Sequence, residues 1–262
     1  MRTCPIFNMR AACLQLFVKP CQPDDNFRRA LALAQVALEQ GAQILVFPEL
    51  FLTGFCYEPA PQSAAQDLPP YPRLDPLRAM AEEHNCLFVG SIRTRRENLG
   101  FCLDRSGLEL RAKIHPFKEE REHFDGGNYI APANTLWGRV GTMICYDLRF
   151  PEVARTLALQ GADILATVAQ FPALRLDQWR TLVAARAIEN QIPHLACNWA
   201  NVGGSLIVSA RGRVQAEAGA EETVIIADID LSDRDLFRKE IPCFADRRPE
   251  IYGRCGLERS NL

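Results

Sequence analysis

The sequence predicts a mixed α/β protein. Short apolar segments alternate with helical segments, a pattern typical of parallel strands with helices on the faces of a sheet. Two stretches, around residues 86–112 and 203–230, resemble hairpins and add antiparallel pairing. No linker and no repeat with a period of roughly 20–50 residues divides the chain. We therefore expect a single domain over residues 1–262, because α/β folds of this size often form one unit.

The first half of the chain supplies the first set of elements. Asp24 or Asp25 can cap a helix that ends at Gly41. Residues 56–72 are rich in Pro, Ala and Gln and are expected to form a surface loop. The expected strands are residues 9–17, 44–47, 86–92, 101–103 and 108–114, and the expected helices are residues 24–40 and 74–84.

The second half continues the same alternation. Its expected strands are residues 140–145, 164–168, 192–197, 205–209, 214–217 and 223–230, and its expected helices are residues 151–160, 177–190 and 232–239. At the N-terminal end, residues 1–8 precede the first strand as an extension, and Met9 is an alternative start of the functional chain. At the other end, residues 241–262 are expected to form an extended tail.

Composition and charge exclude several classes of protein. Hydrophobic residues make up 48% and charged residues 24% of the chain, which excludes a disordered or coiled-coil protein. The net charge of −2 gives no bulk attraction to nucleic acid or to an anionic membrane. No segment approaches the roughly 20 apolar residues of a membrane span, and no secretory leader is recognisable. A cytoplasmic location is therefore expected.

Ten cysteines beside only four histidines are the unusual feature of the composition. No two cysteines form a C-x-x-C pair, so a structural zinc site has little support. In a reducing cytoplasm most thiols stay free, and a free cysteine usually packs as a small buried hydrophobe. We expect one cysteine to carry chemistry and the other nine only to pack.

Three polar residues come at the ends of apolar segments. Glu49 follows the strand expected at residues 44–47, and Lys113 and Cys145 lie at the ends of the strands expected at residues 108–114 and 140–145. Ligands bind at the carboxyl ends of strands in open α/β sheets. There a thiol can attack, a carboxylate can transfer protons and an ammonium group can stabilise developing negative charge. The three positions together predict nucleophilic catalysis.

Four blocks of sequence resemble the signature blocks of the nitrilase superfamily, the carbon–nitrogen hydrolases. They are FPEL at 47–50, KIHPF at 113–117, CYDLRFPE at 145–152 and ARAIENQ at 185–191. Their order and spacing fit, and with the strand pattern the resemblance covers nearly the whole chain. The resemblance implies a single-domain α-β-β-α sandwich with two mixed sheets. It also implies a homodimer that forms through helices near the nucleophile.

The same resemblance implies residue roles. Cys145 corresponds to the nucleophile, Glu49 to the general base and Lys113 to the oxyanion stabiliser. Glu120 fits the family's E-x-x-x-[FY]-x-x-G pattern and would hold Lys113 or position substrate. The backbone N–H of Tyr146 is the expected second oxyanion donor. The implied reaction passes through a thioester and needs no metal and no organic cofactor.

Several neighbouring residues have simpler interpretations. His115 could suggest a Cys–His dyad, which we disfavour because the family carries a histidine there that is not the base. Asp147 and Arg149 are expected to form a structural ion pair behind the nucleophile. Phe171 is expected either to line the pocket or simply to pack. On the helix at residues 177–190, we expect Arg186 to pair with Glu189 and Trp179 to belong to the core.

Within the superfamily, the blocks most resemble the small stand-alone amidases, above all the ω-amidases. The implied substrate is a small amide, with the ω-amide of a 2-oxo dicarboxylic acid as the best candidate. Arg149 or Arg175 could bind its carboxylate. Tyr146 stands where true nitrilases usually carry Trp, and the late strands lack a proline common in relatives, so specificity stays open. The alternatives are hydrolysis of N-carbamoyl amino acids or deaminated glutathione, acyl transfer, and non-catalytic binding.

Overall fold

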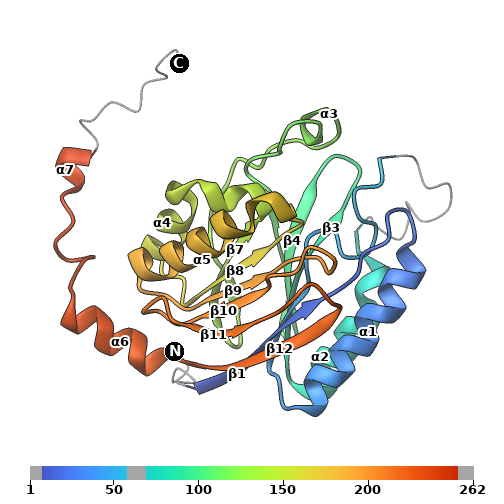
Figure 1. Ribbon diagram of the computed structural model, residues 1–262, viewed down its shortest axis with the longest axis horizontal. Coiled ribbons are helices and arrows are strands. Elements are labelled where there is room, and N and C mark those ends of the chain that lie inside the picture. Colours follow the sequence, from blue (N-terminus) through green and yellow to red (C-terminus); the bar gives the residue numbers. More distant parts are fainter. Residues whose placement is uncertain (1–7, 58–68, 253–262) are drawn as a thin grey trace.

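The computed structural model describes residues 8–57 and 69–252, which form two packed six-stranded sheets (Figure 1). The first sheet contains, in order, β12 (Thr223–Asp230), β1 (Asn8–Gln15), β2 (Ile44–Val46), β3 (Leu87–Arg93), β4 (Asn98–Asp104) and β5 (Gly107–Ala112). The second contains β11 (Val214–Glu217), β10 (Leu206–Val208), β9 (His194–Cys197), β8 (Ile164–Val168), β7 (Gly138–Ile144) and β6 (Ala133–Thr135).

Each sheet has three parallel strands flanked by antiparallel ones. Strands β1, β2 and β3 run parallel in the first sheet, and β7, β8 and β9 run parallel in the second. Every other pairing is antiparallel. The prediction of a mixed α/β fold is therefore confirmed. Strand β6 was not expected, because its residues Ala-Asn-Thr carry no apolar run.

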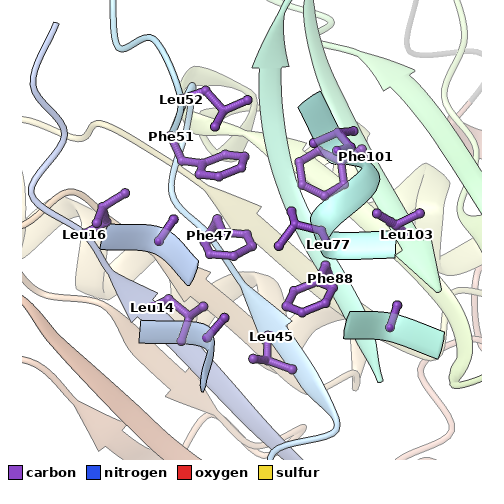
Figure 2. Close-up of a cluster of buried hydrophobic side chains, with 14 of the residues drawn as sticks. Leu14, Leu16, Leu45, Phe47, Phe51, Leu52, Leu77, Phe88, Phe101 and Leu103 are labelled. Atoms are coloured by element: carbon purple, nitrogen blue, oxygen red, sulfur yellow. The ribbon is translucent and has the colours of Figure 1, made fainter. Parts of the chain in front are cut away.

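Two helices cover the outer face of each sheet, which completes an α-β-β-α sandwich. Helices α1 (Pro23–Glu39) and α2 (Asp75–His84) pack on the first sheet, and α4 (Pro151–Leu159) and α5 (Leu176–Asn190) pack on the second (Figure 1). A cluster of aromatic rings anchors the first layer, with Phe47 stacked on Phe51 at 4.5 Å and on Phe88 at 5.8 Å (Figure 2).

The central strands are rich in apolar residues because most of their residues are buried on both faces. In β1, Ala12 and Leu14 pack toward the helices of the first layer, while Ala11 and Cys13 pack in the core between the two sheets. The same alternation recurs in β2. Neither strand therefore has the polar face that a strand with one solvent-exposed side would have. Because the two sheets pack face to face, loops that follow their parallel strands meet: Glu49, after β2, accepts the backbone N–H of Gln170, after β8.

Some element ends differ from expectation. Helix α1 begins at Pro23, with proline in its first turn, so Asp24 and Asp25 lie inside the helix and do not cap it. The last long helix, α6 (Leu231–Glu240), is capped by the Asp230 carboxylate, which accepts a hydrogen bond from the Ser232 N–H. The start of the first strand is described from Asn8, so the expected extension falls almost wholly outside the described residues.

The segment after α6 runs along the edge of the sandwich and away from it (Figure 1). It includes the short helix α7 (Pro249–Tyr252), so the expected tail is not extended throughout. Phe244 of this segment packs below the guanidinium groups of Arg155 and Arg238. Among the residues that the structure describes, no helix has the length and apolarity needed to cross a membrane.

The cysteines do not all pack as free thiols. Cys21 and Cys56 form a disulfide across 35 residues of sequence. The expectation that nine cysteines only pack is therefore wrong for this pair. The two cysteines meet because the loop before α1 lies against the loop after β2, where the Cys21 N–H donates to the Thr53 carbonyl at 2.9 Å. A contact between such distant loops leaves no spacing pattern in the sequence.

Candidate active site

Three strand ends bring Glu49, Lys113 and Cys145 to one site. Glu49 lies three residues after β2, while Lys113 and Cys145 directly follow β5 and β7. The Glu49 and Lys113 side chains are fully buried, at 0% and 1% exposure. Cys145 is half-buried and lines a cavity. The two buried charges therefore stand behind a thiol that a small molecule can reach.

The Lys113 ammonium lies between two carboxylates. Its Nζ is 2.8 Å from Glu49 Oε1 and 2.7 Å from Glu120 Oε2. Burial by itself would lower the pKa of Lys113, but Glu49, Cys145 and Glu120 outweigh it and raise that pKa above its usual value. Lys113 is therefore a permanent cation, and it provides the charge that allows two carboxylates to be buried together.

Glu120 is held in the fold by the same lysine. It begins the short helix α3 (Glu120–His123), and its carboxylate also accepts the Phe117 N–H at 3.3 Å. Burial raises the pKa of Glu120, the Glu49 charge adds to the rise, and Lys113 opposes it. Of the acidic residues between 119 and 122, Glu120 is the one that contacts Lys113, in the register that the sequence predicts.

Both oxygens of the Glu49 carboxylate are fixed by hydrogen bonds. Oε1 accepts the Asn98 side-chain N–H at 2.9 Å as well as Lys113, and Oε2 accepts the Gln170 backbone N–H at 3.0 Å. The Trp199 indole donates to the Glu49 carbonyl at 2.7 Å. Sequence reasoning missed Asn98, Gln170 and Trp199. A polar residue at the start of β4 was the one available signal, and it is weak.

Cys145 occupies a tight turn between β7 and a 3₁₀ helix (Cys145–Arg149). Its φ of 48° lies in the left-handed region, which costs energy for a residue other than glycine. The thiol contacts the Gln170 carbonyl at 3.6 Å. Burial raises the pKa of Cys145 well above its usual value, Glu49 raises it further, and Lys113 opposes the rise. These effects favour the protonated thiol over the thiolate at neutral pH.

Gln170 connects the Glu49 carboxylate to the Cys145 thiol. It follows β8, and its backbone N–H donates to Glu49 while its carbonyl accepts from Cys145. One residue therefore positions a side chain of the first sheet and a side chain of the second. Because only its backbone acts, the type of side chain at this position carries no signal that a sequence pattern could use.

Asp147 ties the turn of the nucleophile to the strand end that carries Lys113. Its carboxylate accepts the backbone N–H groups of Ile144, Ile114 and His115 and contacts His115 Nδ1 at 2.9 Å. The expected ion pair between Asp147 and Arg149 is wrong, because Asp147 turns inward to these donors. Arg149 instead donates to the Gln178 side chain at 2.8 Å.

The other residues considered from the sequence have structural contacts. The His115 ring stacks on Phe150 at 3.6 Å, in addition to its contact with Asp147. The ion pair from Arg186 to Glu189 is confirmed at 2.9 Å, and Arg186 also donates to the Leu148 carbonyl beside the nucleophile turn. Trp179 is confirmed as a core residue at 1% exposure.

A cavity of about 290 Å³ opens over Cys145. Its wall includes Tyr146, Phe171, Arg149 and Arg175. The Arg149 guanidinium lies 5.1 Å from the centre of the Phe171 ring. Cys145 and Glu120 also line this cavity, so it combines a thiol, aromatic surface and two guanidinium groups. Such a site fits a small molecule with an apolar chain and an anionic end.

A second, wider cavity of about 420 Å³ adjoins the first. The two share Phe55, Phe117, Glu120 and Gln170 as wall residues. The wall of the second cavity also includes Tyr57. Burial and the charge of Glu120 raise the pKa of Tyr57 to about 12. Within residues 8–57 and 69–252, no group of three or more His, Cys, Asp or Glu residues could hold a metal ion.

A family model described as carbon–nitrogen hydrolase matches residues 10–239. The chain belongs to the carbon–nitrogen hydrolase family. A 2-oxoglutaramate amidase from Bacillus subtilis is 33% identical to it over 92% of this chain and 98% of the relative. Omega-amidase NIT2 from Xenopus tropicalis is 31% identical over 93% of this chain and 96% of the relative.

A solved structure agrees with this assignment. Nit3 from Saccharomyces cerevisiae, a member of the nitrilase superfamily, has a TM-score of 0.81 and 26% identity over 92% of this chain and 97% of its own. The resemblance to the nitrilase superfamily is therefore confirmed, together with the sandwich fold that it implied. The protein is an enzyme of the amidase and carbon–nitrogen hydrolase class.

Proposed function

We propose that this enzyme hydrolyses a small carboxylic amide to an acid and ammonia through a thioester on Cys145. The observation that carries the proposal is the buried Lys113 between Glu49 and Glu120, next to a half-buried thiol in a cavity. Glu49 acts as the general base, Lys113 stabilises the oxyanion, and Glu120 keeps Lys113 in place. The reaction uses no metal and no organic cofactor.

The proposed first step is the attack of sulfur on the amide carbon. As the C–S bond forms, Glu49 takes the thiol proton and the carbonyl oxygen becomes an oxyanion. The Lys113 ammonium and the Tyr146 N–H stabilise that oxyanion; Tyr146 lies in the first turn of its 3₁₀ helix, where N–H groups have no partner within the helix. Loss of one such donor typically costs about 3–4 kcal/mol in the transition state.

Collapse of the oxyanion breaks the C–N bond. Glu49 returns its proton to the leaving nitrogen, and ammonia departs from the thioester. Glu49 then takes a proton from water, which attacks the thioester carbon, and the C–S bond breaks to release the acid and restore the thiol. Lys113 stays charged throughout and takes no part in proton transfer. Glu49 alone therefore transfers protons in both halves of the reaction.

The proposed substrate is the ω-amide of a 2-oxo dicarboxylic acid. Arg149 and Arg175 in the cavity wall supply the cations that bind its carboxylate, while Phe171 contacts the carbon chain. The names of the relatives from Bacillus subtilis and Xenopus tropicalis support this choice. N-carbamoyl amino acids and deaminated glutathione also carry carboxylates, so they are the first competitors to test.

An ammonia-release screen tests the proposal. It covers ω-amides of 2-oxo dicarboxylic acids, deaminated glutathione, N-carbamoyl amino acids, nitriles and uncharged amides of matched length. We expect the ω-amide to give the highest kcat/KM and the uncharged amide a much lower one. Absence of ammonia from every compound would contradict hydrolysis, and formation of a hydroxamate alone when hydroxylamine is added would favour acyl transfer.

We also propose that two copies form a homodimer and that the protein is cytoplasmic. Leu159 of α4 and Ile188 of α5 are 44% and 47% exposed, so apolar surface is available on the helices implied for pairing. Sedimentation of the whole chain should give twice the mass of 29.4 kDa. Substitution of both residues by Lys should give the monomer mass, and a wild-type monomer would contradict the proposal.

A further inference from the structure

The disulfide between Cys21 and Cys56 joins two segments of the wall of the wider cavity. Pro20, directly before Cys21, lines that cavity. Phe55 and Tyr57, on either side of Cys56, line it as well. The covalent link therefore fixes the loop before α1 to the loop after β2 within the wall of this cavity.

The same loop reaches the chemistry at Cys145. Phe55 is a wall residue of both cavities, and its ring packs against Trp199 at 6.0 Å. Trp199 in turn donates to the carbonyl of Glu49, which lies seven residues before Cys56 on the same loop. A change in the position of Phe55 would therefore alter the space where a substrate binds, while Glu49 keeps its separate anchors in Lys113 and Asn98.

The two cysteine residues differ in exposure. Cys21 is an exposed residue, whereas Cys56 is 5% exposed. Thiol–disulfide exchange depends on access to the sulfur that is attacked. A thiol in solution should therefore attack Cys21, with Cys56 as the leaving group. Neither Cys21 nor Cys56 takes part in the proposed amide chemistry, so they are available for a separate function.

We propose that Cys21 and Cys56 form a thiol–disulfide switch that controls substrate affinity. A low-molecular-weight thiolate attacks Cys21 Sγ, the S–S bond breaks, and Cys56 leaves as a thiolate that takes a proton. A second reagent thiol attacks the reagent sulfur of this mixed disulfide and releases Cys21 as a thiol. The two reagent molecules are then joined to each other as a disulfide. Two reagent thiols are oxidised while one protein disulfide is reduced. An oxidised low-molecular-weight disulfide reverses both steps.

Reduction removes the covalent link but leaves weaker contacts in place. The Cys21 N–H still donates to Thr53, and the Arg93 guanidinium still donates to the Cys56 carbonyl. The cavity wall can then adopt several conformations, of which only one binds the substrate well. The apparent affinity falls in proportion to the fraction of molecules in that conformation. The switch should therefore raise KM and leave kcat nearly unchanged. This inference rests on the proposed function to the extent that the cavity binds the substrate.

Kinetics of the full chain after treatment with oxidised glutathione or with dithiothreitol test the switch. Mass spectrometry first establishes the disulfide and dithiol forms. With the amide that the screen selects, we expect reduction to raise KM about two- to tenfold. The Cys21→Ser/Cys56→Ser double variant should keep the high KM under both conditions. Cys243→Ser, which changes an exposed free cysteine, should respond as the wild type does.

Hydrogen exchange gives a readout that does not depend on turnover. It is measured on Cys145→Ala, so that the cavity thiol cannot form a mixed disulfide. We expect faster exchange in the segment 50–57 after reduction. Equal exchange and equal KM in the two verified redox forms would overturn the switch, and so would failure of oxidised glutathione to form the disulfide. Absence of turnover in both forms would instead contradict the proposed function, while the exchange result would still decide the switch.

Discussion

The two sheets share one pairing pattern but supply different parts of the site. Each has one antiparallel edge strand, three parallel strands and two further antiparallel strands. The first sheet and the loops beyond it provide buried charges, at Glu49, Lys113 and Glu120. The second provides the accessible thiol of Cys145 and the arginines of the cavity. A shared scaffold thus holds the buried charges on one sheet and the accessible thiol and arginines on the other.

The buried charges on the first sheet depend on one another. Lys113 balances two carboxylates, and each carboxylate would be costly to bury without it. The groups of the second sheet carry no such dependence, because Cys145 is uncharged at rest and Arg149 and Arg175 reach the cavity. Substitutions in the first set should therefore affect folding and chemistry together, whereas those in the second should affect function selectively.

The largest effect on activity within the first set is expected for Glu49→Gln. This change keeps the size of the side chain but removes the proposed base, and it replaces one of two accepting oxygens by an N–H donor. We predict that kcat for ammonia release falls about 10³-fold or more. Glu122→Gln, which changes an exposed glutamate near the site, is the matched control and should keep wild-type kinetics. A Glu49→Gln variant within tenfold of the wild type would contradict the role of base.

Lys113→Met tests the mutual dependence of the buried charges. The variant leaves Glu49 and Glu120 buried without a cation, so its free energy of unfolding at neutral pH should fall by about 3–5 kcal/mol. Denaturant titration measures the change. Lys118→Met, which removes an exposed lysine nearby, should change the free energy of unfolding little.

The loss in Lys113→Met should depend on pH. Burial raises the pKa of Glu120 in the folded state, and removal of Lys113 takes away a group that lowers it. The folded variant therefore binds a proton more tightly than the unfolded chain. Its stability should be highest below the ordinary carboxyl pKa and should decrease as pH rises through the raised value. An equal loss at acidic and neutral pH would contradict the pairing.

Arg175→Met tests the selectivity expected for the second sheet. A hydrogen bond to a charged group contributes about 1.5–3 kcal/mol, so KM for an ω-amide acid should rise roughly 10- to 100-fold. The KM for an uncharged amide of equal length should stay the same. Arg180→Met, on the exposed side of α5, should change neither value. Equal effects on both amides would show that Arg175 does not bind the carboxylate.

Asn98→Leu should give the smallest effect. Asn98 donates to Glu49 Oε1 and is 1% exposed, so it acts as a positioning residue for the base. We predict a loss in kcat of about tenfold with KM unchanged, because one hydrogen bond to the Glu49 carboxylate is removed. Asn190→Leu removes another buried asparagine, which donates to the Arg186 carbonyl, and should affect stability alone. An unchanged kcat in Asn98→Leu would exclude the positioning role.

Much of the fold and the main candidate residues could be predicted because they follow from local pattern. The strand preceding Cys145 is mostly apolar from residue 140 onward, since most of that stretch is buried, and the polar residue at its end stands out. The same holds for Glu49 after β2, whereas β5 before Lys113 is half-buried and carries Glu109 and Arg111. Glu120 was indicated by the resemblance to the family, through its match to the E-x-x-x-[FY]-x-x-G pattern.

The contacts that complete the site could not be predicted, because they join distant segments. Gln170 acts through its backbone, so no side-chain pattern indicates it. Asp147 and Arg149 are close in sequence, yet Asp147 turns to the N–H groups of a different loop. Cys21 and Cys56 meet only after α1 and β2 have folded between them.

The most direct test of the division between the two sheets is ammonia release by Cys145→Ala, measured with the best amide from the screen. The variant keeps the buried charges of the first sheet and loses only the proposed nucleophile of the second. We predict a wild-type unfolding midpoint and no ammonia release above the uncatalysed background. Release within tenfold of the wild-type rate would contradict the account, because the thiol would then not be the nucleophile.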